Sequence, residues 1–276
     1  MIAERPPAVV YTDLDGTLLD HDSYRWDAAA PALRALAARG IPWVPVTSKT
    51  VPEVLALRET LSHRHPFAVE NGGAVCVPRG YFDRDCGVAF GPDLFVERLA
   101  PAYADILAVL ADLRREGYRF AGFADMDAAA VARHTGLSVD AAAAARDRLC
   151  SEPLVWEDGD EALERFAGAI AAAGLTLRRG GRFLHVLGAH KGDAVRRLHA
   201  RFAAHGPVLA WALGDSENDL DMLAAADRGA LVARPDGSYV APADPPRLCH
   251  AGDIGPAGWR RAVEGWLDEL EHDNSG

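Results

Sequence analysis

The stretch VVYTDLDGTLLD, residues 9–20, places four β-forming residues directly before two aspartates that are one residue apart. The apolar run predicts a buried strand, and Gly16 with Thr17 predicts a turn at its carboxyl end. Side chains two residues apart in an extended segment point to the same side, so Asp13 and Asp15 should leave the strand together unless the chain turns between them. Two close carboxylates repel each other unless a cation neutralises them or one of them holds a proton.

The sequence on either side of this strand predicts an α/β fold. Helical patterns over 27–39 and 50–61 flank a second apolar strand, and Thr50 with Glu53 has the spacing of a capping box at the start of the second helix. FAVENGGAVCV (67–77) has the pattern of a hairpin. The same alternation resumes after the middle of the chain, with an amphipathic helix, a strand before GDSENDLDML and a C-terminal helix in GPAGWRRAVE. Strands that alternate with helices are typical of a parallel sheet, so we predict a Rossmann-like parallel-sheet core formed by residues 1–80 and 189–276.

The middle of the chain has a different pattern. Residues 81–188 combine helical stretches, including one long helix expected over 95–117, with four short strand candidates: YRFAGF, EPLVW, LTLRRGG and RFLHVLG. This mixture predicts a separate α+β module inserted into the core, with its own set of strands and helices.

Composition excludes several classes of function. The chain has 276 residues, of which 49% are hydrophobic and 25% charged, as in an ordinary globular protein. Its net charge of −11 argues against nucleic acid as the main partner, because such binding relies on clustered Lys and Arg. No apolar stretch reaches the roughly 20 residues of a membrane span, and the first residues do not resemble a signal peptide. We therefore expect no membrane partner and a cytoplasmic location. The four scattered cysteines predict neither a zinc site nor a disulfide framework.

Polar groups gather at three predicted strand ends. The first carries Asp13 and Asp15, the second Thr47 and Ser48, and the third the acids of GDSENDLD (214–221). A lysine, Lys191, stands at the start of the helix that leads back to the third strand. Ligands of open α/β sheets lie at the carboxyl ends of the strands. Acids, a hydroxyl and a lysine at that edge indicate Mg²⁺-assisted phosphoryl transfer.

Four of these motifs occur in the order found in a known family. DLDGTLLD, VTSKT, HKGDAV and GDSENDLDML resemble the motifs of the haloacid dehalogenase superfamily of phosphatases. The wide gap between Thr47 and Lys191 resembles the spacing in type IIB members of this superfamily, which have a large α+β cap inserted after the second motif. Shorter phrases, namely VPVTSKT, ENGG, GGRFLH and GPAGWRRAVE, resemble the mannosyl-3-phosphoglycerate phosphatase family within that superfamily.

The resemblance implies a role for each matching residue. Asp13 would be the nucleophile that forms an aspartyl-phosphate, and Asp15 the general acid and base. Mg²⁺ would be held by Asp13, the carbonyl of Asp15 and Asp215, with Ser216 or Asp219 acting through water. Phosphate binding is implied for three residues: Thr47, Ser48 and Lys191. Substrate binding is expected for five others: Lys49, Asn71, Gly72, Arg182 and His185.

Most of these residues also have a purely structural explanation. Thr47 could cap a strand end, Lys191 could be a surface lysine at a helix start, and Lys49 could point to solvent. Asn71 and the glycine after it form a hairpin signal in their own right. His185 could be a buried structural histidine whose ring is satisfied by its neighbours.

The expected activity is that of a Mg²⁺-dependent phosphatase, which converts mannosyl-3-phosphoglycerate into mannosylglycerate, a compatible solute, and phosphate. The small-molecule partner would be a phosphorylated sugar-glycerate. Three alternatives remain open: a phosphatase for glucosyl-3-phosphoglycerate or another sugar phosphate, a phosphomutase-type phosphotransferase, and a catalytically silent binding protein on the same scaffold. A mutase would transfer phosphate without net release, and a binding protein has no need of Asp13, Asp15, Lys191 and Asp215 together.

Overall fold

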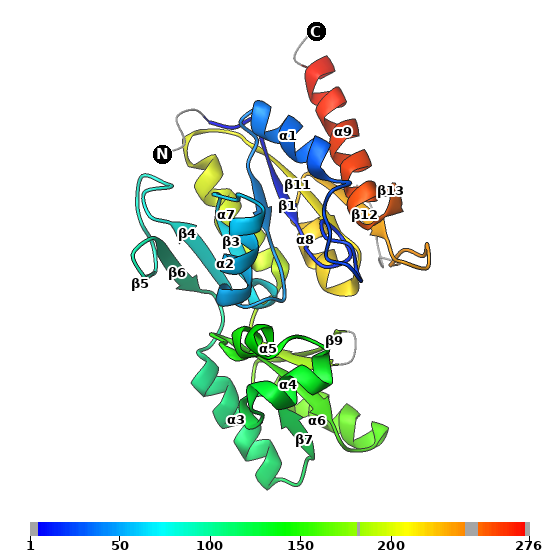
Figure 1. The fold of residues 1–276 in the computed structure, drawn as a ribbon. Coiled ribbons are helices and arrows are strands. Elements are labelled where there is room, and N and C mark those ends of the chain that lie inside the picture. Colours follow the sequence, from blue (N-terminus) through cyan, green and yellow to red (C-terminus); the bar gives the residue numbers. More distant parts are fainter. Residues whose placement is uncertain (1–4, 181–182, 241–247, 274–276) are drawn as a thin grey trace.

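The computed structural model of the chain describes residues 5–180, 183–240 and 248–273. Its central feature is a five-stranded sheet in the order β13-β12-β11-β1-β2, in which every neighbouring pair of strands is parallel (Figure 1). The strands of this sheet are β1 (Ala8–Thr12), β2 (Trp43–Pro45), β11 (Leu209–Gly214), β12 (Arg228–Ala233) and β13 (Leu248–Ile254). The predicted Rossmann-like parallel-sheet core is therefore confirmed.

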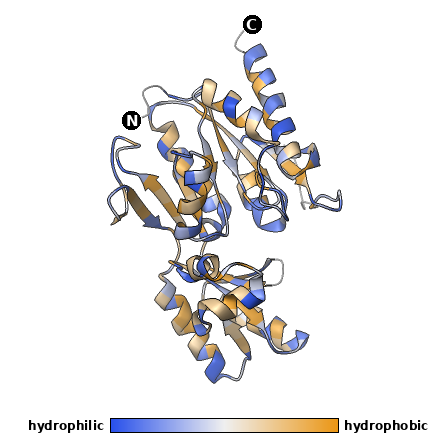
Figure 2. Cartoon of the chain, viewed as in Figure 1, coloured by the Kyte–Doolittle hydropathy of each residue, from blue (hydrophilic) through white to orange (hydrophobic). Residues whose placement is uncertain are grey.

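Helices cover both faces of this sheet, and β1 shows why. Its residues alternate between two hydrophobic cores, with Ala8 and Val10 in one core and Val9 and Tyr11 in the other. The first core is completed by α1 (Ala30–Ala38) and α9 (Gly255–Asp273), the second by α7 (Lys191–Phe202) and α8 (Leu220–Ala224). Figure 2 shows the resulting pattern, with apolar strands and helices that are polar toward solvent.

A second, antiparallel sheet lies beside the parallel one. Its order is β3-β4-β6-β5, and a bridge between Val46 and Ala68 connects it to the end of β2. The strands are β3 (Phe67–Val69), β4 (Ala74–Pro78), β5 (Val88–Phe90) and β6 (Leu94–Arg98). Strands β3 and β4 confirm the predicted hairpin, and the 3₁₀ turn Glu70–Gly72 (η1) connects them.

The long helix predicted over 95–117 is wrong in its first part. Residues 94–98 form β6, and the helix α3 (Tyr103–Arg115) starts after Pro101. Leu94 and Val96 are buried on one face of β6, which pairs with β4 through five residues. This distant pairing overrides the local helical propensity.

A third sheet and four helices form a separate part of the molecule, drawn in green below the two other sheets in Figure 1. The sheet order is β7-β8-β10-β9, and every pair is antiparallel. Its strands are β7 (Phe120–Gly122), β8 (Ser151–Trp156), β9 (Thr176–Gly180) and β10 (Phe183–Leu187). Its helices are α3, α4 (Ala128–Thr135), α5 (Val139–Arg146) and α6 (Asp160–Ala172). Buried residues of α3 and α6, including Ile106 and Phe166, give this part its own core.

The loop before α2 (Val51–Thr60) contacts the separate part of the molecule that holds α5. Thr50 is the N-cap of α2 and forms the predicted capping box with Glu53. The Thr50 hydroxyl also donates to the carbonyl of Ala144 in α5, at 2.8 Å. None of the helices in the described ranges is long and apolar enough to cross a bilayer.

Candidate active site

A buried lysine between two aspartates lies at the centre of the site. Lys191, the first residue of α7, is 1% exposed, and its Nζ donates to Asp13 Oδ1 and to Asp219 Oδ1, both at 2.6 Å. Asp13 directly follows β1, and Asp219 ends the 3₁₀ turn Glu217–Asp219 (η4) after β11. The parallel sheet places these two strand ends side by side, since β1 pairs with β11. The lysine therefore offsets part of the repulsion between acids from two neighbouring strands.

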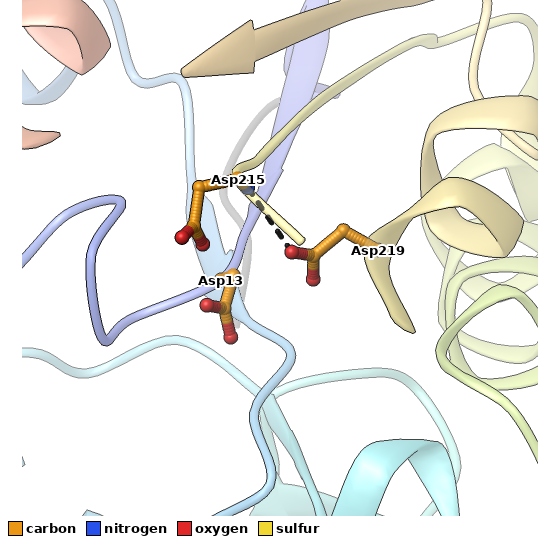
Figure 3. A group of neighbouring side chains, drawn as sticks. All are labelled: Asp13, Asp215 and Asp219. Carbon is orange, nitrogen blue, oxygen red and sulfur yellow. Dashed lines mark hydrogen bonds between the residues drawn. The ribbon is translucent and has the colours of Figure 1, made fainter. Parts of the chain in front are cut away.

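Asp219 holds the loop that follows β11. While its Oδ1 accepts from Lys191, its Oδ2 accepts from the backbone N–H of Ser216 at 3.0 Å. The same Oδ2 accepts from the backbone N–H of Asp215 at 3.1 Å, the hydrogen bond drawn in Figure 3. The hydroxyl of Ser216 donates to the same oxygen at 2.8 Å. Both oxygens of Asp219 are thus already occupied, which makes this carboxylate an anchor for the loop.

The turn after β1 packs against Asp215. Thr17 donates from Oγ1 to Asp215 Oδ1 at 3.0 Å, a contact between acid and turn that the sequence reading did not predict. Gly16 has φ +81°, and a Cβ at this position would lie 2.8 Å from Asp215 Oδ2. Glycine is required here because the backbone is left-handed and the carboxylate approaches it closely.

Three carboxylates could hold a cation together. Oxygen atoms of Asp13, Asp215 and Asp219 all lie within 4.8 Å of one another, and all three residues are buried (Figure 3). Burial raises the pKa of Asp13 well above its ordinary value, with Lys191 opposing the shift, and burial together with Asp219 raises the pKa of Asp215 to about 6. A hard divalent cation suits such an all-oxygen group and would stabilise its ionised form. Within the described residues, Asp13 Oδ2 and Asp215 Oδ2 accept no hydrogen bond, so these two residues are the best placed to bind it.

Asp15 has a cation of its own. Lys49 Nζ donates to Asp15 Oδ2 at 2.7 Å and lies 5.2 Å from the centre of the Tyr24 ring. The other oxygen, Asp15 Oδ1, is buried and has no hydrogen-bond partner in the part of the chain that the structure describes. The two aspartates of the opening stretch thus pair with two different lysines, Asp13 with Lys191 and Asp15 with Lys49. The carboxylate of Asp15 is not part of the three-acid group.

The loop after β2 brings the predicted phosphate-binding hydroxyls to the same edge of the sheet. Thr47 is buried, and its Oγ1 accepts from the N–H of Lys49 at 3.2 Å. Backbone bonds tie this loop to the β3–β4 turn: Glu70 N–H donates to the carbonyl of Lys49, and Asn71 N–H to that of Thr47. Ser48 is partly buried, and its carbonyl accepts from Arg148 at 3.2 Å.

Asn71 and Gly72 contact the site from the β3–β4 turn. Asn71 Oδ1 accepts from Asn218 Nδ2 at 3.0 Å, which connects the turn to the loop after β11. A Cβ on Gly72, which has φ +88°, would lie 2.3 Å from the carbonyl of His190. The turn therefore fits closely against the start of α7, where Lys191 begins.

Sequence reasoning missed a buried carboxylate beside this loop. Glu70 is 1% exposed and accepts from the N–H of Leu149 at 2.7 Å, the N–H of Cys150 at 3.0 Å and the hydroxyl of Ser151 at 2.8 Å. Arg148 lies 3.8 Å from it. The only sequence signal was ENGG itself, which predicts a turn and says nothing of partners 79 to 81 residues away.

No contact among the described residues links the predicted substrate-binding residues of the middle segment to the acids and lysines of the site. His185 lies on β10 opposite Pro153 and Arg178, and burial lowers its pKa to about 3, so its ring is neutral at physiological pH. Its Nδ1 is buried and, among the residues that the structure describes, has no hydrogen-bond partner. Arg182 lies outside the described residues.

Comparison with known proteins gives the chain a family. Residues 10–82 match the haloacid dehalogenase-like hydrolase family. A glucosyl-3-phosphoglycerate/mannosyl-3-phosphoglycerate phosphatase of Methanococcoides burtonii is 40% identical over 259 residues, which are 92% of this chain and 95% of that protein. A relative of the same name in Persephonella marina is 33% identical over 267 residues, covering 95% of this chain and 98% of that one.

Solved structures share the fold at lower identity. BT1666 from Bacteroides thetaiotaomicron, a phosphatase of the haloalkanoate (HAD) enzyme superfamily, aligns with a TM-score of 0.65 at 19% identity and covers 95% of this chain and 96% of its own. The high identity and nearly complete coverage of the two relatives carry the assignment. The chain belongs to the haloacid dehalogenase-like hydrolase family, and it is a phosphoric monoester hydrolase.

Proposed function

We propose that this chain is a Mg²⁺-dependent phosphatase of glycosyl-3-phosphoglycerates, which releases phosphate from the mannosyl compound and from its glucosyl counterpart. The observation that carries the proposal is the 40% identity, across 95% of its length, to a relative whose name includes both substrates. The name of this relative adds the glucosyl compound as an equal substrate, whereas the sequence alone ranked the mannosyl compound first. The predicted cytoplasmic location belongs to the same proposal.

Asp13 acts as the nucleophile in this proposal. A carboxylate oxygen of Asp13 attacks phosphorus, and a new O–P bond forms as the bond from phosphorus to the glycerate oxygen breaks. Asp15 gives its proton to the departing glycerate oxygen. In the second half of the reaction, Asp15 takes a proton from water. The resulting hydroxide attacks phosphorus, and the Asp13 carboxylate leaves.

Asp13 and Asp215 would hold the metal, and Asp219 keeps the loop that carries Asp215 in place. Mg²⁺ bound there would neutralise the charge of the substrate phosphate beside the carboxylates. Lys191 already bridges Asp13 and Asp219 and adds a fixed positive charge beside these carboxylates. Phosphate oxygens would also be bound by Thr47 and Ser48, at the neighbouring strand end.

The Lys49–Asp15 pair suits a substrate that carries a carboxylate. Asp15 has to donate a proton to serve as an acid, and in this structure its Oδ2 instead accepts a hydrogen bond from Lys49 at 2.7 Å. A glycerate carboxylate would offer Lys49 a new partner and release Asp15 to take up a proton. Lys49 is thereby assigned to substrate binding, as the sequence predicted, and acts on the acid as well.

The middle segment serves as the cap that selects the substrate in this proposal, with His185 and Arg182 as candidate contacts. We place its limits near residues 99 and 188. The sequence-based boundary at residue 80 is shifted because β5 and β6 pair with β4 of the core and not with the cap sheet.

Release of inorganic phosphate tests the proposal. Mannosyl-3-phosphoglycerate, glucosyl-3-phosphoglycerate, mannose 6-phosphate and 3-phosphoglycerate would each be incubated with the protein, with Mg²⁺ or with EDTA. We expect EDTA-sensitive release from the two glycosyl-3-phosphoglycerates and much less from the others. Equal release from all four compounds would contradict the proposed substrate specificity. Transfer of phosphate without net release would indicate a mutase instead.

A further inference from the structure

A cavity of about 610 Å³ lies away from the acidic site and plays no part in the mechanism above. It is lined by the segment after β4, the residues before β1 and the C-terminal half of α7. Lys191 begins α7, and Arg201 of the cavity follows ten residues later, about 15 Å along the helix axis. The volume is in the range of small-molecule sites. We propose that this cavity binds an anion whose charged group is carried by a flat aromatic body.

Aromatic rings form one wall of the cavity. The ring of Phe82 contacts those of Tyr81 and Phe202 edge to face, each with centroids 5.0 Å apart. The guanidinium of Arg201 lies 4.4 Å from the centroid of Phe82. Flat apolar rings pack well against such a wall, in offset or edge-to-face geometry.

The charge around the cavity is positive, in a chain whose net charge is −11. Arg5, Arg84 and Arg201 all line it, and within the described residues none of the three pairs with a carboxylate. Of the acids nearby, Asp83 also lines the cavity and shares a hydrogen bond of 2.7 Å with His205, and Glu97 pairs with Arg197 at 2.7 Å. Guanidinium groups without a counter-charge at one apolar cavity favour a ligand that supplies the negative charge.

One nitrogen of Arg201 gives this inference a specific atom. Its Nη2 donates to the carbonyl of Arg84, whereas Nη1 is buried and has no partner among the described residues. A buried donor of a charged group is costly when it is left unpaired, so such atoms call for an explanation. An anionic oxygen in the cavity pairs with Nη1 once the Arg201 side chain turns toward the ligand, whose ring then packs beside Phe82.

The ligand class follows from these two features together. The planar fork of a guanidinium matches carboxylate, sulfonate and phosphate oxygens, and the rings favour an aromatic body. The proposed substrate of the acidic site has no aromatic group, so the two sites would select different compounds.

Titration with 8-anilinonaphthalene-1-sulfonate tests the proposal on the whole chain. This probe combines an aromatic body with one sulfonate, and its fluorescence rises in an apolar site. We expect saturable binding at one site, which persists when saturating inorganic phosphate and Mg²⁺ are present. Arg201→Met should weaken binding at least about tenfold, the factor of one charge-assisted hydrogen bond. Arg196→Met, on the same helix but outside the cavity lining, should leave the affinity unchanged.

A second variant separates loss of the ligand site from loss of fold. Ala200→Trp adds a large ring at an exposed position in the lining without removing any charge, and it should also abolish binding. Phosphate release should be retained in both cavity variants, which shows that they fold. Unchanged affinity in Arg201→Met and Ala200→Trp would overturn the proposal, as would displacement of the probe by phosphate and Mg²⁺. Failure of the proposed substrate assignment would leave this result untouched, because the binding measurement needs no substrate.

Discussion

Asp13 and Asp15 follow the same strand, but their surroundings give them different chemistry. Asp13 is buried between Lys191 and the other acids, whereas Asp15 is more exposed and pairs with Lys49. A buried carboxylate that is desolvated and held by one lysine is a fixed group, ready to attack in one direction. An acid at the edge of the site, held by a lysine that a substrate can draw away, is suited to exchange protons with water.

Replacing the nucleophile should abolish turnover and leave the fold intact. Asp13→Asn keeps the shape of the side chain but removes the charge that attacks phosphorus, so phosphate release should fall at least about a thousandfold. The measurement is phosphate release from mannosyl-3-phosphoglycerate with Mg²⁺, with circular dichroism as the check of folding. Asp22→Asn, at an exposed position outside the three-acid group, is the matched control and should retain activity. Substantial turnover by Asp13→Asn would refute the nucleophile assignment.

Lys49→Met should separate substrates that carry a carboxylate from those that do not. For mannosyl-3-phosphoglycerate we expect kcat/KM to fall about tenfold or more, because a charge-assisted contact with the glycerate is lost. p-Nitrophenyl phosphate has no carboxylate to attract Lys49, so its turnover should be unchanged or faster once Asp15 is released. Arg64→Met, at an exposed position, controls for the loss of positive charge. Equal losses on both substrates would contradict the proposed exchange of partners.

At the scale of elements, the turn between β3 and β4 connects the core to the middle segment. Glu70 and Asn71 both have left-handed backbones, with φ of 52° and 56°. Such conformations are costly for residues other than glycine, and the surrounding contacts have to hold them in place. The Glu70 carboxylate receives three donors from residues 149–151, and its N–H holds the carbonyl of Lys49. Movement of the middle segment would therefore displace the loop that carries Thr47 and Lys49.

Glu70→Gln should weaken both the fold and catalysis. Glutamine has one acceptor oxygen and one NH₂ group, so at least one of the three donors loses its acceptor, at a cost of about 1–3 kcal/mol in the free energy of unfolding. Urea unfolding measures this loss, and we also expect kcat to fall more than KM changes, because the loop with Lys49 is loosened. Glu264→Gln breaks an exposed i,i+4 pair with Arg260 and should change stability by less than about 1 kcal/mol. Indistinguishable stabilities and kcat values for the two variants would rule out this role for Glu70.

The elements that the sequence predicted well are those whose signals are local. The Thr50–Glu53 capping box and the β3–β4 hairpin depend on residues within a few positions of each other, and both are present. The strand β6 was predicted as helix because its pairing with β4 depends on residues about 20 positions away. The acids and Lys191 could be grouped in advance because parallel strands end at one edge of the sheet. The partners of Lys49 and Glu70 could not, since they depend on how particular loops fold against each other.

At the scale of the whole molecule, the two ends of the core have different tasks. Its carboxyl edge carries the acids and the two lysines, on the side toward the middle segment (Figure 1). The arginine-lined cavity lies toward the other end of α7. A chain with net charge −11 thus gathers positive side chains at a few places, which favours local capture of anions.

Buried histidines should make the fold sensitive to acid. Burial lowers the pKa of His65 from 6.5 to about 4, and its Nδ1 lies 2.8 Å from the hydroxyl of Tyr81. Below pH 6.5 the unfolded chain takes up a proton that the folded chain takes up only near pH 4. The free energy of unfolding therefore falls as the pH drops through this window, by up to about 3 kcal/mol from this group.

Urea unfolding of the wild-type chain and His65→Gln between pH 7 and pH 4 measures this contribution. Glutamine keeps a polar partner for Tyr81 and does not titrate, so the variant should lose less stability on acidification. His21→Gln, at an exposed position, is the control and should follow the wild type. The same pH dependence in His65→Gln as in the wild type would contradict the assignment.

The most direct test of the central claim is to trap the phosphoryl group on the protein during turnover. The chain would be mixed with mannosyl-3-phosphoglycerate and Mg²⁺ and quenched with borohydride, which reduces an acyl phosphate to an alcohol, and its peptides would be mapped by mass spectrometry. The proposed mechanism predicts that Asp13 is converted to homoserine, only when substrate and Mg²⁺ are both present. Reduction at another carboxylate, or none while phosphate is being released, would contradict it.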